Sequence, residues 1–340
     1  MKQSRTKRVL AIGELKFATN TLKRLSEKYH FEFIVPDPHD RSKTIVKIHE
    51  AASKSTFDAC FWLFRNAAIS PFTEEMLGPL LPTCKLFVTG AAGYNNVDVD
   101  WATRNGVYVA NTPNGPTEGT ANMNLMLFMC TLRGAREAEQ SLRLGKWRQN
   151  LSLTDDPYGK RVGIIGMGAI GKSFAQKILP LGCEIVYHNR NRLEAEEEKR
   201  LGASFVSFDE LLSSSDVISI NCPLTPATHD LISTKEFEKM KDGVYIINTA
   251  RGAIINEDAF IKAIKSGKVA RAGLDVFLNE PTPNKFWLEC DKVTIQPHCG
   301  VYTNFTVAKT EECVLASIET FLDTGIPTNP VNGPFGMNGC

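Results

Sequence analysis

The sequence has 340 residues, of which 43% are hydrophobic and 23% charged, and its formal net charge is +1. This length suggests about two domains and is enough to bury a large core. A net charge near zero gives no electrostatic reason to expect nucleic acid or an anionic membrane as a partner. The nine cysteines form no C-x-x-C pair and the six histidines show no metal spacing, so we expect reduced thiols and no metal site.

No apolar run approaches the length of a transmembrane helix. The basic segment at residues 2–8 is not followed by the apolar stretch of a signal peptide, and Val9–Ile12 already has the character of a strand. We therefore expect a cytoplasmic protein that does not associate with membranes.

Short strands and helices alternate through the first third of the chain. Strands are expected at Val9–Ile12, Phe31–Val35, Ala59–Phe64, Leu86–Thr89 and Val107–Val109, and helices at Leu22–Tyr29, Ile45–Ala52 and Glu74–Leu77. This alternation predicts a parallel, doubly wound α/β sheet. It contains no glycine fingerprint, so we expect this part to do something other than bind a dinucleotide.

The segment at residues 89–98 is rich in small residues and directly follows an expected strand. Its backbone N–H groups would lie at the carboxyl edge of the sheet, where open α/β folds bind ligands. The residues alone nevertheless favour a plain turn. The breaker cluster at 111–116 marks a domain boundary, and a long helix over Glu118–Leu144 is expected to connect two domains.

The next part of the chain predicts a strand, a glycine-rich turn, a helix and a second strand. The strands are expected at Val162–Ile165 and Glu184–Tyr187, and the glycines are Gly166, Gly168 and Gly171. This order is typical of a dinucleotide-binding unit, in which the first glycine allows the turn and the second lets backbone approach the pyrophosphate. The third permits close packing of helix and strand. Residues 166–173 also match G-x-x-x-x-G-K-S, so a P-loop stays an alternative, and a glycine turn that binds nothing is a further one.

The strand at Glu184–Tyr187 is followed by basic and amide residues rather than by an acid. An acid here would accept the ribose hydroxyls of NAD(H), whereas Asn189, Arg190 and Arg192 would accommodate a 2′-phosphate. This favours NADP(H), with NAD(H) as a possible second cofactor. A basic surface turn without function is the alternative.

Further strand and helix units complete the chain. Strands are expected at Asp216–Ile220, Val244–Ile247, Ala272–Phe277 and Val293–Ile295, and helices at Asn256–Ile264 and Thr303–Leu322. Arg251, Glu280 and His298 each lie just past one of these strands, so the three side chains can meet at one edge of the sheet. The three residue types suit hydride transfer to a 2-keto acid. A histidine can transfer the proton, a carboxylate can orient the histidine, and a guanidinium can bind the carboxylate of the substrate.

These motifs resemble, in order and spacing, the D-isomer-specific 2-hydroxyacid dehydrogenase family, and within it the glyoxylate and hydroxypyruvate reductases, especially those of fungi. The resemblance extends over nearly the whole chain. The matching segments are Gly90–Asp98, Gly166–Gly171, Pro223–Thr225 with Thr228, Asn248–Gly252, Gly273–Phe277 with Glu280–Pro281, and Pro297–His298 with Gly300.

The resemblance implies a role for each matching residue. Arg251 binds the substrate carboxylate, His298 protonates the carbonyl oxygen, and Glu280 supports His298. Backbone groups at Ala92 and Gly93 hold the carboxylate as well. The implied cofactor contacts come from Ala169 and Ile170 at the pyrophosphate, Cys222 and Pro223 at the adenosine, and Thr249, Ala250 and Asp275 by the nicotinamide. Gly300 is a further implied cofactor contact.

The resemblance also implies two doubly wound lobes joined by long helices. A flavodoxin-like substrate or catalytic lobe would comprise residues 1–115 and 305–340, and a Rossmann dinucleotide-binding lobe residues 116–304. It implies a homodimer built largely through the second lobe. The chain departs from the family pattern at Thr120-Ala121-Asn122, where relatives often have an acid, and at Val301 and Tyr302, whose bulk could reshape the substrate pocket.

The sequence therefore predicts an NADPH-preferring reductase of small 2-keto acids, with glyoxylate or hydroxypyruvate as substrate. The rival hypothesis is a dinucleotide-sensing binding protein like the corepressors that resemble this family, since those keep the arginine, glutamate and histidine. A P-loop nucleotide hydrolase is a remote third.

Overall fold

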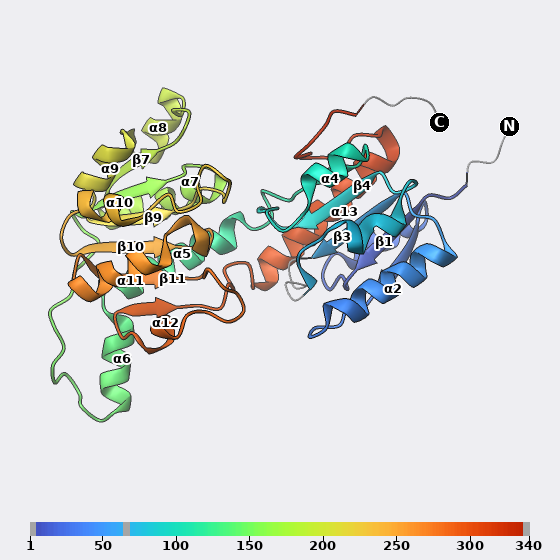
Figure 1. Ribbon diagram of the computed structural model, residues 1–340. Helices are drawn as coiled ribbons and strands as arrows, with labels where there is room; N and C mark the ends of the chain where they lie inside the picture. Colours follow the sequence, from blue (N-terminus) through green and yellow to red (C-terminus); the bar gives the residue numbers. More distant parts are fainter. Residues whose placement is uncertain (1–4, 64–68, 336–340) are drawn as a thin grey trace. The chain divides into compact units, whose positions relative to one another are not determined.

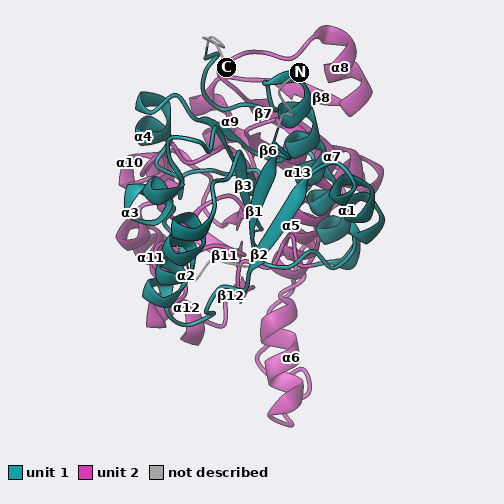
Figure 2. Cartoon of the chain, turned by 90° about the vertical axis from the view of Figure 1, so that its right-hand side faces the viewer, with its two compact units in different colours: residues 1–116, 303–340 teal, residues 117–302 magenta. Residues whose placement is uncertain are grey.

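The computed structural model describes residues 5–63 and 69–335 of the chain, so Phe64, the expected end of the third strand, lies outside these ranges. Two compact units comprise residues 1–116 with 303–340, and residues 117–302 (Figure 2). The boundaries expected from the sequence differ from these by one or two residues. Each unit is built around one parallel sheet.

The sheet of the first unit has the strand order β2-β1-β3-β4-β5, which is the flavodoxin-like order (Figure 1). The strands are β1 (Arg8–Ile12), β2 (His30–Ile34), β3 (Ala59–Leu63), β4 (Leu86–Gly90) and β5 (Tyr108–Ala110). Its helices are α1 (Thr19–Ser26), α2 (Arg41–Lys54), α3 (Glu74–Leu77), α4 (Val99–Arg104) and α13 (Asn304–Thr324), with a short 3₁₀ turn η2 (Gly78–Leu80). Strands β1, β3, β4 and β5 are almost wholly buried because helices cover both faces, whereas the edge strand β2 leaves Phe33 39% exposed.

Helix α13 returns from the end of the chain to this N-terminal sheet. Its buried residues Val314, Leu315 and Ile318 pack against β1, β3 and β4. The buried carboxylate of Glu311 on the same helix accepts backbone N–H groups of Lys16, Phe17 and Ala18, at 2.7–3.1 Å, just before α1. This buried acceptor satisfies the first N–H groups ahead of α1 and fixes the two ends of the chain in one unit.

The sheet of the second unit has seven parallel strands in the order β12-β11-β10-β9-β6-β7-β8. The strands are β6 (Arg161–Ile165), β7 (Glu184–His188), β8 (Ala203–Phe205), β9 (Val217–Ile220), β10 (Val244–Asn248), β11 (Val269–Leu274) and β12 (Val293–Ile295). The order reverses between β6 and β9, which is the Rossmann arrangement, and folds of this kind bind ligands outside the carboxyl ends of these two strands. The predicted α/β class with two doubly wound parallel sheets is confirmed.

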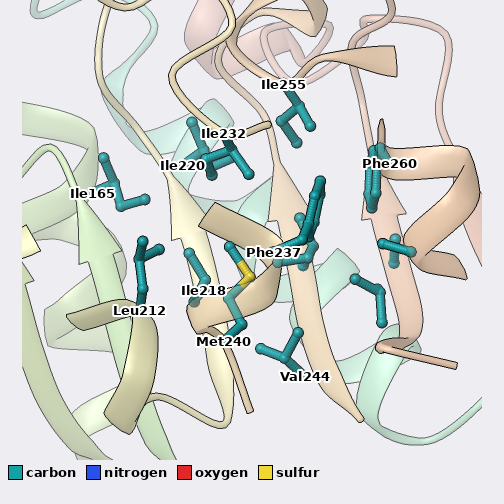
Figure 3. Close-up of a cluster of buried hydrophobic side chains, with 14 of the residues drawn as sticks. Ile165, Leu212, Ile218, Ile220, Ile232, Phe237, Met240, Val244, Ile255 and Phe260 are labelled. Carbon is teal, nitrogen blue, oxygen red and sulfur yellow. The ribbon is translucent and has the colours of Figure 1, made fainter. Parts of the chain in front are cut away.

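Helices cover both faces of this second sheet. They are α5 (Thr117–Leu132), α6 (Ala135–Arg143), α7 (Ala169–Ile178), α8 (Ala195–Leu201), α9 (Phe208–Ser214), α10 (Thr234–Lys239), α11 (Glu257–Ser266) and α12 (Lys285–Glu289), with 3₁₀ turns η3 (Leu179–Leu181) and η4 (Gly252–Ile254). Figure 3 shows one of the two resulting cores, to which Ile218 and Ile220 of β9 and Phe237 contribute. Phe237 in turn stacks on Phe260, with 5.6 Å between the ring centroids. In the described part of the chain no helix is both long and apolar enough to cross a membrane.

The prediction of a single long helix over Glu118–Leu144 is wrong. The structure breaks it after Leu132, where Gly134 adopts a left-handed backbone conformation with φ of 55°, and a separate α6 begins at Ala135. Glycine adopts this conformation without the steric cost that a side chain imposes. As a result α6 leaves the direction of α5 and projects away from the rest of its unit (Figures 1 and 2).

Candidate active site

The glycine turn between β6 and α7 has the geometry of a dinucleotide cradle. Gly166 has φ of 97°, and a Cβ there would lie 2.6 Å from the backbone nitrogen of Cys222. A Cβ on Gly171 would overlap the carbonyl oxygen of Gly166, so only glycine lets the helix start this close to the turn. At Gly168, by contrast, a Cβ would meet nothing within 4 Å. The open backbone at Gly168, followed by Ala169 and Ile170 at the helix start, fits an approaching pyrophosphate.

The lysine and serine side chains with which a P-loop binds phosphate and Mg²⁺ are each bonded to a glutamate in this structure. The Lys172 ammonium forms an ion pair with Glu197 of α8, with 2.7 Å between Nζ and Oε2. The Ser173 hydroxyl donates to Glu118 of α5 at 2.8 Å. In a P-loop this lysine reaches the phosphates and this hydroxyl holds Mg²⁺. The geometry therefore supports the dinucleotide interpretation over the literal P-loop match.

The three residues that follow β7 have different surroundings. The Asn189 side-chain oxygen accepts the Met167 backbone N–H at 2.7 Å and so ties the end of β7 to the glycine turn. Arg192 forms two hydrogen bonds to Glu198, at 2.8 and 2.9 Å. Arg190 is exposed and makes no hydrogen bond or ion pair within the described ranges. The sequence does not reveal this difference among the three.

The segments after β9 and β10 leave the same carboxyl edge of the sheet, because these strands are parallel neighbours. Cys222 and Pro223 follow β9, and the backbone of Cys222 touches the glycine turn. After β10, Thr249 is 6% exposed and its hydroxyl is buried without a hydrogen-bond partner among the described residues. A buried hydroxyl without a partner is costly unless a ligand or water satisfies it. This orphaned hydroxyl and the open backbone at Gly168 both fit a dinucleotide bound at this edge of the sheet.

Arg251 is held by a close backbone contact between two strand ends. The Asn248 side chain accepts the N–H of Ala250 at 3.0 Å and donates to the Arg251 carbonyl at 2.9 Å, which shapes the segment. A Cβ on Gly252 would overlap the backbone of Phe277 and Leu278, so the segments after β10 and β11 are in contact. Burial lowers the pKa of Arg251, and the nearby carboxylate of Glu280 opposes that shift. The guanidinium stays charged, because an arginine side chain does not lose its proton in proteins.

His298 and Glu280 form a close pair, with 2.6 Å between Nδ1 and Oε2. The other carboxylate oxygen of Glu280 accepts the Phe277 N–H at 2.9 Å. Burial on its own raises the pKa of Glu280, but the bond from His298 and the other nearby donors and cations outweigh it, so the net pKa is lowered. An ionised carboxylate only accepts, so Nδ1–H of His298 is the donor and Nε2 faces elsewhere. The pair can orient an imidazole for proton transfer.

Asp275 fixes the segment that carries His298. Its two carboxylate oxygens accept the backbone N–H groups of Cys299 and Gly300 at 2.8 and 2.9 Å. The backbone of His298 has φ of 52°, a conformation that residues other than glycine seldom adopt. Burial raises the pKa of Asp275 although these two N–H groups lower it. The acid after β11 was visible in the sequence, but its contact with this segment was not predicted.

The second unit therefore brings Arg251, Glu280 and His298 to adjoining strand ends. The other two expected substrate residues, Ala92 and Gly93, lie in the first unit, in the segment that follows β4. There the Ala92 carbonyl accepts the Asn111 side chain at 2.7 Å, and the Thr112 N–H bonds to Ala91 at 3.0 Å. The segment is thus fastened within its own unit.

The lowered pKa of Glu280 makes stability depend on pH. A carboxyl with a folded pKa below its ordinary 4.5 stabilises the fold fully above pH 4.5 and loses that contribution as pH falls through the folded pKa. We expect wild type to exceed Glu280→Gln in free energy of unfolding at neutral pH. The difference should shrink as the pH falls below 4.5.

Urea unfolding of both variants over a pH series measures this difference. The same substitution in a His298→Gln background is the control, and its pH-dependent effect should be smaller because the main partner is gone. A difference between wild type and Glu280→Gln that did not change with pH would contradict the assignment.

Comparison with known proteins agrees with this geometry. Residues 125–300 match the family model described as D-isomer specific 2-hydroxyacid dehydrogenase, NAD binding domain. The chain is 43% identical over 255 residues to 4-methyl-2-oxopentanoate reductase A of Aspergillus oryzae, covering 75% of this chain and 77% of the relative.

Two solved structures are similar over almost the whole chain. One is a glyoxylate reductase from Paecilomyes thermophila, with 36% identity, a TM-score of 0.88, and coverage of 96% of this chain and 99% of that one. The other is Rhodotorula graminis D-mandelate dehydrogenase in its holo form, with 30% identity, a TM-score of 0.90, and coverage of 98% and 99%. With the family model spanning more than half of its length, this chain belongs to the D-isomer specific 2-hydroxyacid dehydrogenase family.

Proposed function

We propose that this protein reduces glyoxylate to glycolate, which is achiral, or hydroxypyruvate to D-glycerate, preferring NADPH and also accepting NADH. The observation that carries the proposal is the His298–Glu280 pair, held 2.6 Å apart on strand ends that adjoin Arg251. The cytoplasmic location expected from the sequence stays a prediction.

Each residue of this set has a task in that reaction. Arg251 offers a planar fork of N–H donors that matches the carboxylate of a 2-keto acid. His298, with Nδ1 engaged by Glu280, presents Nε2 to deliver a proton to the carbonyl oxygen. Glu280 accepts a hydrogen bond from Nδ1 and so fixes the tautomer and the orientation of the imidazole. A bound reduced nicotinamide supplies the hydride.

The second unit is proposed to hold the dinucleotide. The turn at Gly166, Gly168 and Gly171, with Ala169 and Ile170, would meet the pyrophosphate. The remaining contacts would come from Cys222, Pro223, Thr249, Ala250, Asp275 and Gly300. The absence of an acid at the end of β7, together with Asn189, Arg190 and Arg192, supports NADP(H). The first unit would contribute Ala92 and Gly93 to substrate binding.

A second candidate substrate class is a larger 2-keto acid with a branched side chain. A relative that is 43% identical is named 4-methyl-2-oxopentanoate reductase A, and Val301 and Tyr302 near His298 add apolar bulk. Tyr302 is 69% exposed, so its ring is available to a ligand.

The loss of absorbance of reduced nicotinamide tests this function. Purified protein is given NADPH or NADH with glyoxylate, hydroxypyruvate or 4-methyl-2-oxopentanoate. We expect the highest kcat/KM for NADPH with one of the two small acids. Replacing His298 with Ala should lower kcat by about 100-fold or more and leave cofactor affinity unchanged, because proton transfer contributes that much.

Other outcomes of the assay are equally informative. A His298→Ala protein that turns over at the parental rate would remove His298 as proton donor. Tight cofactor binding without turnover of any keto acid would favour the dinucleotide-sensing alternative. Highest activity with 4-methyl-2-oxopentanoate would select the second substrate class.

The contact at Gly252 gives a second kinetic prediction. In Gly252→Ala the new methyl group would overlap the backbone of Phe277 and Leu278, so the segments carrying Arg251 and Glu280 must separate. We expect kcat/KM for the keto acid to fall by about 100-fold, the loss typical of a small misplacement. Gly78→Ala is the matched control, since its Cβ makes only an ordinary 3.5 Å contact. Steady-state kinetics measure the effect. A folded Gly252→Ala protein with the parental kcat/KM would contradict the prediction that the contact at Gly252 positions Arg251 and Glu280.

A homodimer through the second unit is also proposed. The projecting α6 and the segment after it expose large apolar side chains: Leu142, Leu144, Trp147, Leu153 and Tyr158 are 58–101% exposed. Their base is fastened by an ion pair between Glu137 and Arg271 and by a hydrogen bond from Tyr245 to Asp155. An anchored projection with an apolar surface fits a second copy of the chain.

Disrupting this apolar surface should therefore yield monomers. We expect Leu144→Asp with Leu153→Asp to shift the sedimentation coefficient from dimer to monomer. Ile326→Asp, at an exposed apolar residue of the first unit, is the control and should stay dimeric. A wild-type protein that sediments as a monomer would refute the proposal.

A further inference from the structure

We propose that Asn111 is a positioning residue for the substrate, and that residues 328–335 hold Asn111 in place by pairing with the open edge of β5. The inference rests on the proposed function, in which the backbone of Ala92 and Gly93 binds the substrate carboxylate. It adds the residues that give this backbone its direction.

Residues 328–335 form a partner for the edge strand of the first sheet. Strand β5 is last in the strand order, so β4 occupies only one of its sides. On the other side the Val331 N–H donates to the Val109 carbonyl at 2.8 Å, and the Asn111 N–H donates to the Asn329 carbonyl at 3.3 Å. The segment thus satisfies backbone groups that an edge strand leaves unpaired, and it extends this pairing to the residue after β5.

The side chain of Asn332 fixes how this segment lies against β5. Its Oδ1 accepts the Val109 N–H at 2.7 Å. Its Nδ2 donates to the Val107 carbonyl and to the Thr103 hydroxyl, both at 2.9 Å. Three hydrogen bonds from one amide define the register of the segment, and with it the position of Asn329 beside Asn111.

Two successive residues after β5 in turn hold two successive carbonyls of the segment after β4. The Asn111 Nδ2 donates to the Ala92 carbonyl at 2.7 Å, and the Thr112 N–H donates to the Ala91 carbonyl at 3.0 Å. Thr112 is buried and Asn111 is partly buried, so water has little access to either bond.

These bonds set the direction of the N–H groups that follow. The peptides joining Ala91 to Ala92 and Ala92 to Gly93 are trans, so each N–H points opposite to the carbonyl of the residue before it. The N–H groups of Ala92 and Gly93 are therefore turned away from Asn111 and Thr112, and no group of the described residues accepts either of them. Two neighbouring N–H donors held in this way suit a carboxylate.

Steady-state kinetics test the role of Asn111 with a readout that general destabilisation would not move. Asn111→Leu has a side chain of similar size but no donor for the Ala92 carbonyl. We expect the KM for the keto acid to rise about tenfold, the usual worth of one hydrogen bond, with kcat and the KM for NADPH within about twofold of the parental values. The constants separate in this way because the carboxylate contact is the same in the bound substrate and in the transition state.

Asn105→Leu is the matched control. The Asn105 side chain also donates to a backbone carbonyl of the first unit, that of Trp101 at 2.9 Å, but this carbonyl belongs to α4. We expect its thermal midpoint to fall, while kcat and both KM values stay within about twofold of the parental values.

Asn332→Leu tests the second part of the proposal. Removing its three hydrogen bonds should raise the KM for the keto acid by about three- to tenfold. In the Asn111→Leu background the same change should add less than about twofold, because the two residues act through one contact. Asn332→Leu also carries the test if Asn111→Leu does not fold.

Two results would overturn the inference in a wild type that reduces keto acids. One is a folded Asn111→Leu protein with the parental KM for the keto acid. The other is an Asn332→Leu change that leaves this KM unaltered or raises it equally in both backgrounds. A wild type that turns over no keto acid is a different failure, since it removes the proposed function and this inference with it.

Discussion

The backbone contact between Gly252 and Phe277–Leu278 is the constraint on which the candidate site depends. Strands β10 and β11 are neighbours in the sheet, so the segments after them leave from the same edge. Because Gly252 has no side chain, these segments meet, and Arg251 lies within the electrostatic influence of Glu280. Any side chain at residue 252 would force the segments apart, whatever it did to Arg251 itself.

Carboxylates and amides then fix the remaining segments from within the same unit. Glu280 accepts from Phe277 and from His298, and Asp275 accepts from the two residues that follow His298. Asn189 ties the end of β7 to the glycine turn. Each of these groups has its acceptor oxygens occupied by neighbouring N–H groups, so the functional side chains are held before any ligand arrives. Such preorganisation is what orientation-dependent catalysis requires.

Much of this arrangement could be predicted from the sequence because it depends on local pattern. The alternation of strands and helices gave the two parallel sheets, and the positions of Arg251, Glu280 and His298 after strands indicated a common edge. The break between α5 and α6 was missed because the apolar pattern outweighed a single glycine, although Gly134 was its signal.

The side-chain pairings could not be predicted in the same way. Whether Arg192 faces a ligand or Glu198 depends on how α8 packs beside β7, and nothing in the spacing of six residues decides it. The contact of Asp275 with Cys299 and Gly300 likewise joins segments 24 and 25 residues apart in the chain. Such pairs follow from tertiary packing, so only the structure distinguishes an available cation from a compensated one.

The proposed function depends on one edge of the second sheet, which presents Arg251 to a carboxylate and His298 to a carbonyl oxygen. A crystal structure with NADPH and oxamate, an analogue that accepts no hydride, tests this most directly. We expect the Arg251 fork to bind the oxamate carboxylate and His298 Nε2 to lie about 3 Å from the amide oxygen that stands for the carbonyl. Oxamate bound away from Arg251, or His298 facing away from that oxygen with its bond to Glu280 broken, would contradict it.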